Sequence, residues 1–448
     1  MGDYLRVVSE FVAKTTYADI DPKILGHAKK VVYDTIGVIA AGAQEEEVKR
    51  LTQLLIDGDS TSGSTLIGQA LKTNPLQAAF INGTAGTWLE LDEGNQYARG
   101  HAAVHVLPAA LAVGEVIGAS GKDFLTAVTL GYEIACRVGK SSKLKMTMHP
   151  HGTWGTIGAA VAVGKLMKVN WEGMQRLINI ASSLTLATSR RTMLEGGTVR
   201  NTYAGAGAYM GVLSYKLLKC GFTGELDGLK SVFGNVVSDV FDEEAFVANL
   251  GREYEIVKNY FKMYPCCRYV HASLDAVQKI VGRCSGEELH PEKIESIEVE
   301  TYSLAAQLSD QKPSNMLAAK FSIPFCLASA IVFGSIWVEN FQSDNLNDPR
   351  VRRLAERVFV KENSEFTAMM PRYRPSRVTV KLKDGRELTE TVFVNKGDPE
   401  DPYSDEDLEG KFISLVKGIY GVEKAQEILR RIKQLDELAN IRYLACEL

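Results

Sequence analysis

The sequence predicts a mainly α-helical protein in which one large helical domain is interrupted by a smaller α+β domain. Apolar residues follow helical spacing through most of residues 1–265, strand-like alternation begins only after Pro265, and helical spacing returns beyond residue 400. A chain of 448 residues also exceeds the size at which one core stops growing. We therefore expect residues 1–265 and 401–448 to build the helical domain and residues 266–400 the α+β domain.

The first long helix is expected over residues 21–42, "DPKILGHAKKVVYDTIGVIAAG". Asp21 suits the N-cap, Pro22 suits the first helical position and Gly42 suits the end. The same periodicity predicts further helices over 1–14, 75–91, 107–120, 121–141, 155–169, 173–189 and 205–221. Many of them carry Ala and Gly on more than one face, which lets helix axes approach closely and indicates buried helices in a large bundle.

The α+β domain is expected to contain a strand over 294–302 and a hairpin over 376–394. Both runs alternate apolar and polar residues, and Asp384-Gly385 suits a tight turn with positive φ. Helices are expected over 271–282 and 324–334. The polar stretch 395–410 leads out of this domain, and helices over 411–421 and 423–438 follow it.

The composition is that of an ordinary globular protein, with 45% apolar and 24% charged residues. A net charge of −4 gives no reason to expect nucleic acid or an anionic membrane as a partner. No apolar run reaches the length that spans a bilayer. Seven cysteines, an odd and sparse number, favour reduced thiols and a cytoplasmic location.

Four segments carry more polar side chains than their apolar surroundings require. They contain Glu90, Asp92, Glu93, His101 and His105; His149, His151 and Thr153; Arg200; and Lys262, Arg268 and His271. Three of the four place cationic or potentially cationic groups at the start of a helix, where free N–H groups and the helix dipole attract carboxylates. The pattern favours an enzyme that binds a small carboxylate.

Each of these residues also has a structural interpretation. His105, between two valines, is more often a packed histidine than a functional one, and Arg200 could pair with Glu195. Zinc is a weaker alternative for His101 and His105, because a helix start near Pro108 would break their i, i+4 spacing and four Cys/His ligands do not stand out. The adjacent Cys266 and Cys267 lack the spacing of a metal knuckle.

The order and spacing of several segments resemble the MmgE/PrpD family over essentially the whole chain. These segments are "DTIGVIAAG", "NGTAGTWLELDEGN", "GHAAVHVLPAALAVGE", "HPHGTWGTIGAAVAVGKLM", "YFKMYPCC", "KFSIPFCLASAIVFG" and "VNKGDPEDPYSDEDLEGKF". The resemblance implies a large helical domain with a smaller α+β lid, in a homodimer. It also implies cofactor-independent chemistry on a carboxylate, as in 2-methylcitrate dehydratases, cis-aconitate decarboxylases and an iminodisuccinate epimerase.

Residue by residue, the resemblance implies a catalytic set of Asp92, His101, His149 and Lys262. It places Glu90 and Arg200 at the substrate, and we add His151, Thr153 and Phe325 to the expected substrate contacts. Arg200 replaces a lysine found in several members, which keeps a carboxylate anchor but removes a proton donor. Phe325 replaces a tyrosine of decarboxylase members, which counts against cis-aconitate decarboxylation.

These residues predict a lyase that moves a proton at a carbon next to a carboxylate, most simply a 2-methylcitrate dehydratase-like hydro-lyase. An iminodisuccinate epimerase-like isomerase is the first alternative, a cis-aconitate decarboxylase-like lyase the second, and a catalytically silent carboxylate sensor the third. We find no Walker loop and no dinucleotide fingerprint. Accordingly we expect no cofactor and no metal.

Overall fold

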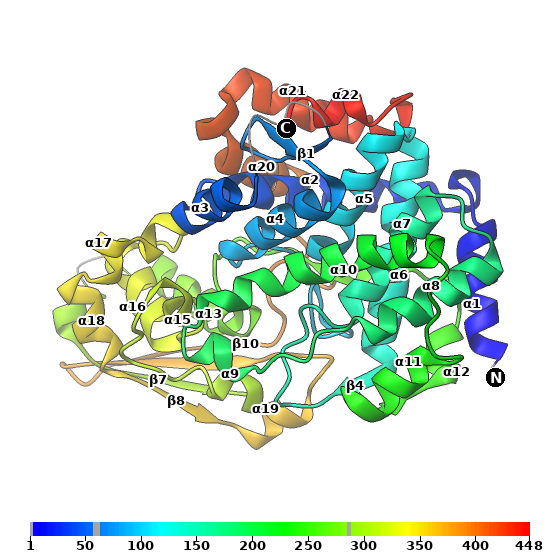
Figure 1. The fold of residues 1–448 in the computed structure, drawn as a ribbon. Coiled ribbons are helices and arrows are strands. Elements are labelled where there is room, and N and C mark those ends of the chain that lie inside the picture. Colours follow the sequence, from blue (N-terminus) through cyan, green and yellow to red (C-terminus); the bar gives the residue numbers. More distant parts are fainter. Residues whose placement is uncertain (1–2, 57–62, 285–287) are drawn as a thin grey trace. The chain divides into compact units, whose positions relative to one another are not determined.

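A computed structural model describes residues 3–56, 63–284 and 288–448 of the chain, and its predominant element is the α-helix, as predicted (Figure 1). The chain forms two compact units. Unit 1 contains Met1–Arg190, Asn201–Tyr260 and Ser404–Leu448, and unit 2 contains Arg191–Arg200 and Phe261–Tyr403. Among the described residues, every helix is too short or too polar to traverse a lipid bilayer.

Unit 1 is a bundle of helices with three short strand pairs. Its helices are α1 (Asp3–Lys14), α2 (Pro22–Gly42), α3 (Glu46–Leu55), α4 (Pro75–Trp88), α5 (Ala103–Ile117), α6 (Gly121–Ser141), α7 (Trp154–Leu166), α8 (Trp171–Ser183), α10 (Thr202–Lys219), α11 (Gly228–Ser231), α12 (Glu243–Val247), α20 (Asp405–Tyr420), α21 (Val422–Lys433) and α22 (Arg442–Ala445). The antiparallel pairs are β1 (Ser64–Leu66) with β2 (Leu71–Thr73), β3 (Gly94–Asn95) with β6 (Asn259–Tyr260), and β4 (Ser142–Leu144) with β5 (Ser238–Phe241).

Small residues bring the central helices of unit 1 together, as the Ala/Gly composition predicts. A Cβ on Gly205 of α10 would lie 2.2 Å from the carbonyl oxygen of Phe80 in α4. A Cβ on Gly211 would lie 2.4 Å from the Cβ of Ala159 in α7. The helix α2 begins as predicted, with Asp21 accepting from the N–H of Lys23.

The expected helix start near Pro108 is wrong, because α5 begins at Ala103 and Pro108 lies inside it. The N–H of Ala103 donates to Glu93 Oε1 at 3.1 Å. Glu93 lies ten residues before the helix and caps it through a contact that no local sequence motif predicts. Because His101 still precedes the helix, the two histidines do not share a helical face.

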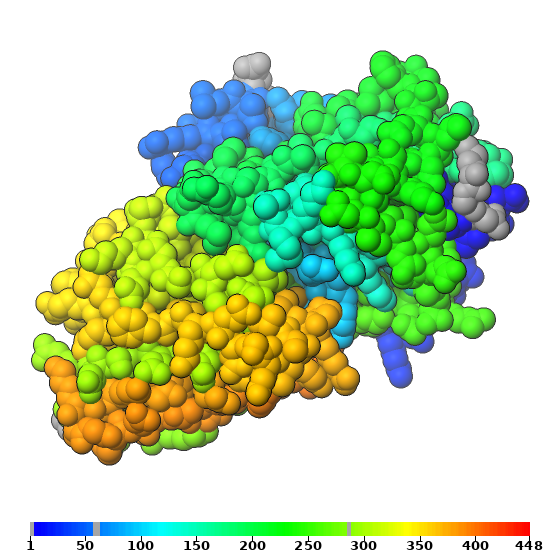
Figure 2. All heavy atoms as spheres, turned by 90° about the horizontal axis from the view of Figure 1, so that it is seen from below, coloured from blue at the N-terminus to red at the C-terminus, as the bar shows by residue number. Residues whose placement is uncertain are grey.

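Unit 2 is an α+β unit built on a four-stranded sheet in the order β10-β9-β7-β8. The strands are β7 (Ile294–Thr301), β8 (Val358–Glu362), β9 (Ser376–Leu382) and β10 (Glu387–Val392). The helices are α9 (Arg191–Leu194), α13 (Arg268–Arg283), α14 (Ser303–Ala306), α15 (Met316–Lys320), α16 (Ile323–Phe333), α17 (Ser343–Leu346), α18 (Pro349–Ala355) and α19 (Ser364–Ala368). Helices α13 and α16 lie on one face of the sheet (Figure 1). In the space-filling view, the yellow and orange residues of unit 2 form a continuous mass (Figure 2).

The predicted hairpin of unit 2 forms between β9 and β10, but its turn is longer than a two-residue turn. The N–H of Leu382 donates to the carbonyl oxygen of Arg386, so that residues 383–385 form the connection. Only Gly385 of the predicted Asp384-Gly385 pair has a positive φ, +89°. A three-residue loop with glycine in the left-handed region is the next most common hairpin after the two-residue type.

Candidate active site

A strained loop between α4 and α5 carries the first group of predicted site residues. Glu90 and Arg99 have positive φ values, +57° and +55°. This backbone conformation is unfavourable for residues other than glycine, and residues that adopt it are found disproportionately at functional sites. Between them, the side chain of Asn95 accepts from the N–H groups of Tyr97 and Ala98. These contacts fold the loop tightly just before His101.

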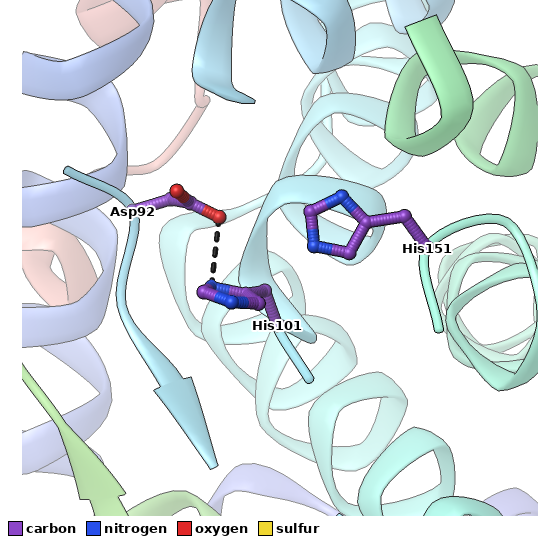
Figure 3. A group of neighbouring side chains, drawn as sticks. All are labelled: Asp92, His101 and His151. Carbon is purple, nitrogen blue, oxygen red and sulfur yellow. Dashed lines mark ion pairs between the residues drawn. The ribbon is translucent and has the colours of Figure 1, made fainter. Parts of the chain in front are cut away.

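Asp92 and His101 form a buried carboxylate–imidazole pair in unit 1 (Figure 3). Asp92 Oδ2 lies 2.8 Å from His101 Nδ1, and the Asp92 side chain is fully buried. The same Nδ1 lies 2.7 Å from the backbone oxygen of Glu93. Because both neighbours are acceptors, Nδ1 carries the proton, and Nε2 of the neutral ring is left as the basic nitrogen.

Glu93 connects the elements that surround the Asp92–His101 pair through hydrogen bonds. Its carboxylate accepts from Tyr132 Oη of α6 at 2.7 Å and from Asn259 Nδ2 of β6 at 3.2 Å, in addition to the N–H of Ala103. Burial raises the pKa of Glu93 to about 7 despite these hydrogen bonds. Glu93 therefore ties the start of α5 to α6 and to the β3–β6 pair, a role that sequence reasoning missed because these partners are distant in the chain.

The segment from His149 to Thr153 leads into α7 and carries the second group. The N–H of His151 donates to His149 Nδ1 at 3.1 Å, which places the proton of the neutral His149 ring on Nε2. The rings of His149 and Tyr203 meet edge to face, 5.6 Å apart. Thr153 Oγ1 donates to the carbonyl oxygen of Pro150 at 2.5 Å. The hydroxyl proton of Thr153 therefore stabilises the turn.

His105 has a structural role, as its apolar neighbours indicated. Its Nδ1–H donates to the carbonyl oxygen of His101 at 2.8 Å, and its Nε2 accepts from the N–H of Gly152 at 3.0 Å. A Cβ on Gly155 would lie 2.4 Å from the ring, so α7 packs directly on it. Burial lowers the pKa of His105 to about 4, and the ring stays neutral.

The remaining predicted residues lie in unit 2. Lys262 is fully buried just after β6. The guanidinium of buried Arg200 lies 5.4 Å from the ring centroid of Phe321, while Glu195, its alternative partner, pairs with Arg191 instead. Phe325 packs against Phe341 within the apolar core of unit 2, which also contains Cys266 and Cys267.

Buried charge differs in sign between the two units. Among the described residues of unit 2, buried cations outnumber buried carboxylates by five to two: Arg200, Lys262, Arg268, Lys320 and Arg374 against Asp275 and Asp398. Among the described residues of unit 1, buried carboxylates outnumber buried lysine and arginine side chains by seven to two. They are Asp34, Glu90, Asp92, Glu93, Glu115, Glu133 and Glu255 against Arg137 and Lys411. Burying like charges is costly unless counter-charges compensate. Part of this charge is compensated within each unit, because Arg268 pairs with Asp398 and Glu133 pairs with Arg137.

Unit 1 thus brings together several of the predicted residues. His151 lies between His101 and His149, with ring centroids 4.9 Å and 4.7 Å away, and Asp92 pairs with His101. Glu90 is buried in the strained loop. Asp92, His101 and His151 also form a donor group that could hold a metal ion.

The chain matches two consecutive domains of a known family. The MmgE/PrpD N-terminal domain matches residues 6–244, and the MmgE/PrpD C-terminal domain matches residues 264–437. The chain belongs to the MmgE/PrpD family. The predicted resemblance is confirmed, and the paired Asp92 and His101 lie within the N-terminal domain of the family.

Several curated relatives have lyase names. A cis-aconitate decarboxylase of Aspergillus terreus is 27% identical, with 94% of this chain and 91% of the relative covered. The cis-aconitate decarboxylase of Mus musculus is 24% identical, with coverage of 94% and 88%. The 2-methylcitrate dehydratase of Escherichia coli K12 is 22% identical, with coverage of 82% and 81%. Membership of a family with lyase relatives is therefore established.

Proposed function

We propose that this MmgE/PrpD protein is a cofactor-independent lyase that removes water from a small hydroxy di- or tricarboxylate, in the manner of 2-methylcitrate dehydratase. The observation that carries the proposal is the Asp92–His101 pair, 2.8 Å apart, in which the carboxylate is fully buried. A carboxylate that fixes the imidazole tautomer leaves the other ring nitrogen as an oriented general base.

In the first half of the proposed reaction, His101 Nε2 takes a proton from the carbon next to a substrate carboxylate. The electron pair left on carbon delocalises into that carboxylate as an enolate-like dianion, which cations stabilise. Membership of the MmgE/PrpD family supports Arg200 and Lys262, both of them buried, as the groups that bind the carboxylates. Asp92 stabilises the imidazolium that forms on His101.

In the second half, the carbon–oxygen bond breaks and a carbon–carbon double bond forms. The hydroxide that departs takes the proton from His101 and leaves as water, so that the imidazole returns to its starting state. His149 holds its proton on Nε2 because Nδ1 accepts from the backbone. We assign it to donating a hydrogen bond to the departing oxygen rather than to a full proton transfer, since a neutral imidazole is a weak acid.

Decarboxylation is the second candidate function, and the names of the relatives favour it. Five of the matched relatives carry cis-aconitate decarboxylase names, at 23–27% identity. Loss of CO2 would leave the electron pair on the carbon that carried the departing carboxylate, and His101 in its protonated form would donate a proton to that carbon. Phe325 argues against this reaction, because a phenyl ring packed on Phe341 cannot donate a hydrogen bond.

An epimerase would use the same base to exchange the carbon proton without releasing water or CO2, and a sensor would do neither. A panel of di- and tricarboxylates that includes 2-methylcitrate and cis-aconitate, followed by NMR in D2O, separates these four functions. We expect alkene formation with loss of water. Carbon-bound deuterium without net conversion would replace the proposal with the epimerase, release of CO2 with the decarboxylase, and thermal stabilisation alone with the sensor.

His101→Asn is the first variant to test on the substrate found. We expect turnover to fall at least a hundredfold, because the general base is lost. The matched control is His290→Asn, which replaces an exposed histidine of unit 2. It should leave turnover unchanged, and a similar decrease in both variants would contradict the assignment of His101.

A further inference from the structure

His151 is the central ring of a histidine cluster, although the proposed reaction gives it no proton to carry. The rings of His101, His105 and His149 meet it edge to face, with centroids 4.9, 5.5 and 4.7 Å away. His151 is 1% exposed. Four of the seven histidines of the chain are gathered here.

We propose that Asp92, His101 and His151 bind one divalent transition-metal ion of the zinc class, and that its binding inhibits the enzyme. Each residue offers one ligand atom, and the three atoms lie within 4.8 Å of one another. The side chains of Asp92 and His151 both point toward the ring of His101 (Figure 3). Two imidazoles and a carboxylate form a donor set suited to Zn²⁺, Co²⁺, Ni²⁺ or Fe²⁺.

The separations fit a metal after small side-chain rotations. Adjacent ligands that bind at about 2.1 Å lie roughly 3.0 Å apart in octahedral geometry and about 3.4 Å apart in tetrahedral geometry. Asp92 Oδ2 and His101 Nδ1 are already 2.8 Å apart. Drawing the remaining ligand atoms inward from at most 4.8 Å requires movements on the order of 1 Å.

The surroundings also favour a cation. Buried Glu90 and Glu93 flank Asp92 in the sequence. The loop that presents Asp92 and His101 is held in place by Asn95, so that two of the three ligands are preorganised before the metal arrives. The third, His151, comes from the turn before α7.

Inhibition follows from the identity of the ligands. A bound ion would occupy the Asp92 carboxylate and His101 Nδ1, so that the ring proton moves to Nε2 and the lone pair that takes the carbon proton in the proposed reaction is lost. This consequence depends on the proposed function, whereas the binding itself does not.

Metal binding is tested with the full-length protein after removal of metals. We expect ZnCl2 titration by calorimetry to show one ion per chain, and CoCl2 to give d–d absorption without a thiolate charge-transfer band. Asp92→Asn and His151→Asn should each weaken Zn²⁺ binding at least tenfold, with folding checked by thermal melting. Stoichiometric binding that survives both variants, a thiolate band, or no saturable binding to the wild type would overturn the site.

Two controls exclude other ligands. His290→Asn and the double variant Cys220→Ser/Cys446→Ser replace exposed residues outside the cluster, and both should keep the wild-type Zn²⁺ affinity. A tenfold loss in either would overturn the assignment of the ligands. If Zn²⁺ binds as expected but no carboxylate is converted, the proposed function fails and the site stands. If conversion proceeds unaffected while Zn²⁺ is bound at this site, the inhibitory part of the proposal fails.

Discussion

At the scale of single residues, backbone groups decide which nitrogen of each histidine carries the proton. The carbonyl oxygen of Glu93 accepts from His101 Nδ1, while the N–H of His151 donates to His149 Nδ1. The two rings therefore present opposite properties at Nε2, a lone pair on His101 and an N–H on His149. An elimination needs one base to take the carbon proton and one hydrogen-bond donor to assist the departing oxygen.

Asp92→Asn should reduce kcat at least a hundredfold and leave the fold intact. An amide carries no negative charge and cannot stabilise the imidazolium that forms on His101. Steady-state kinetics with the substrate, together with thermal melting, measure both effects. A kcat within threefold of the wild type in a folded Asp92→Asn protein would contradict the role of the pair.

His105 should make stability depend on pH. Its folded pKa of about 4 lies below the unfolded value of about 6.5, so the unfolded chain binds the proton more readily and stability falls as the pH decreases from 6.5 toward 4. The slope from this one group approaches 1.4 kcal/mol per pH unit, about 3 kcal/mol in all.

Urea unfolding across this pH range measures that slope. His105→Gln keeps an acceptor for the N–H of Gly152 but does not titrate, and it should flatten the pH dependence by roughly the amount that His105 contributes. An unchanged slope in His105→Gln would show that folding does not shift the pKa of His105, which would contradict the buried neutral ring.

At the scale of elements, close approach of helix axes positions the loops that carry the site. Gly205 of α10 contacts the backbone of α4, and Gly155 of α7 contacts the His105 ring. Helix α4 leads into the strained loop, and α7 follows the His149 segment. The positions of the site loops therefore depend on helix packing at a few small residues.

Gly205→Ala should destabilise the protein by about 2 kcal/mol or more, because the added methyl overlaps the carbonyl oxygen of Phe80. The control is Gly26→Ala, at an exposed position of α2 where a Cβ meets nothing within 4 Å. Alanine should stabilise that helix by about 0.5–1 kcal/mol. Urea unfolding of both variants measures the difference, and equal effects would contradict the close packing of α4 and α10.

At the scale of the whole molecule, each unit has its own chemical character. Described acidic groups dominate the buried charge of unit 1, and described cations dominate that of unit 2. We propose that Asp92 and His101 supply the base and that Arg200 and Lys262 bind the substrate carboxylates.

Arg200 and Lys262 test that division of roles. Lys262→Ala should lower kcat/KM at least a hundredfold, since a charge contact to the substrate is lost. Arg200→Ala should lower kcat/KM to a similar extent. The kcat/KM of Arg200→Lys should stay within about tenfold of the wild-type value, because lysine keeps the charge. Steady-state kinetics of the three variants decide the matter, and an Arg200→Ala protein as active as Arg200→Lys would contradict a carboxylate contact.

The sequence allowed the helical class and the family to be predicted, because periodicity and short motifs are local, and it indicated Asp92 as a carboxylate that orients either His101 or His149. It did not reveal that Glu93 caps α5, since that contact joins a loop to a helix start. It also did not reveal that His151 is the centre of the histidine cluster, because two chain segments that are distant in the sequence converge there. Such features depend on tertiary packing, which one sequence does not display.

Proton transfer at carbon by the Asp92–His101 pair is the central claim, and NMR in D2O on the wild type and on Asp92→Asn tests it most directly. The account predicts that the wild type converts a hydroxy di- or tricarboxylate to an alkene with loss of water, and that Asp92→Asn does so at least a hundredfold more slowly. Wild-type protein that leaves every carboxylate of the panel unchanged and unlabelled, or a variant that reacts at the wild-type rate, would contradict it.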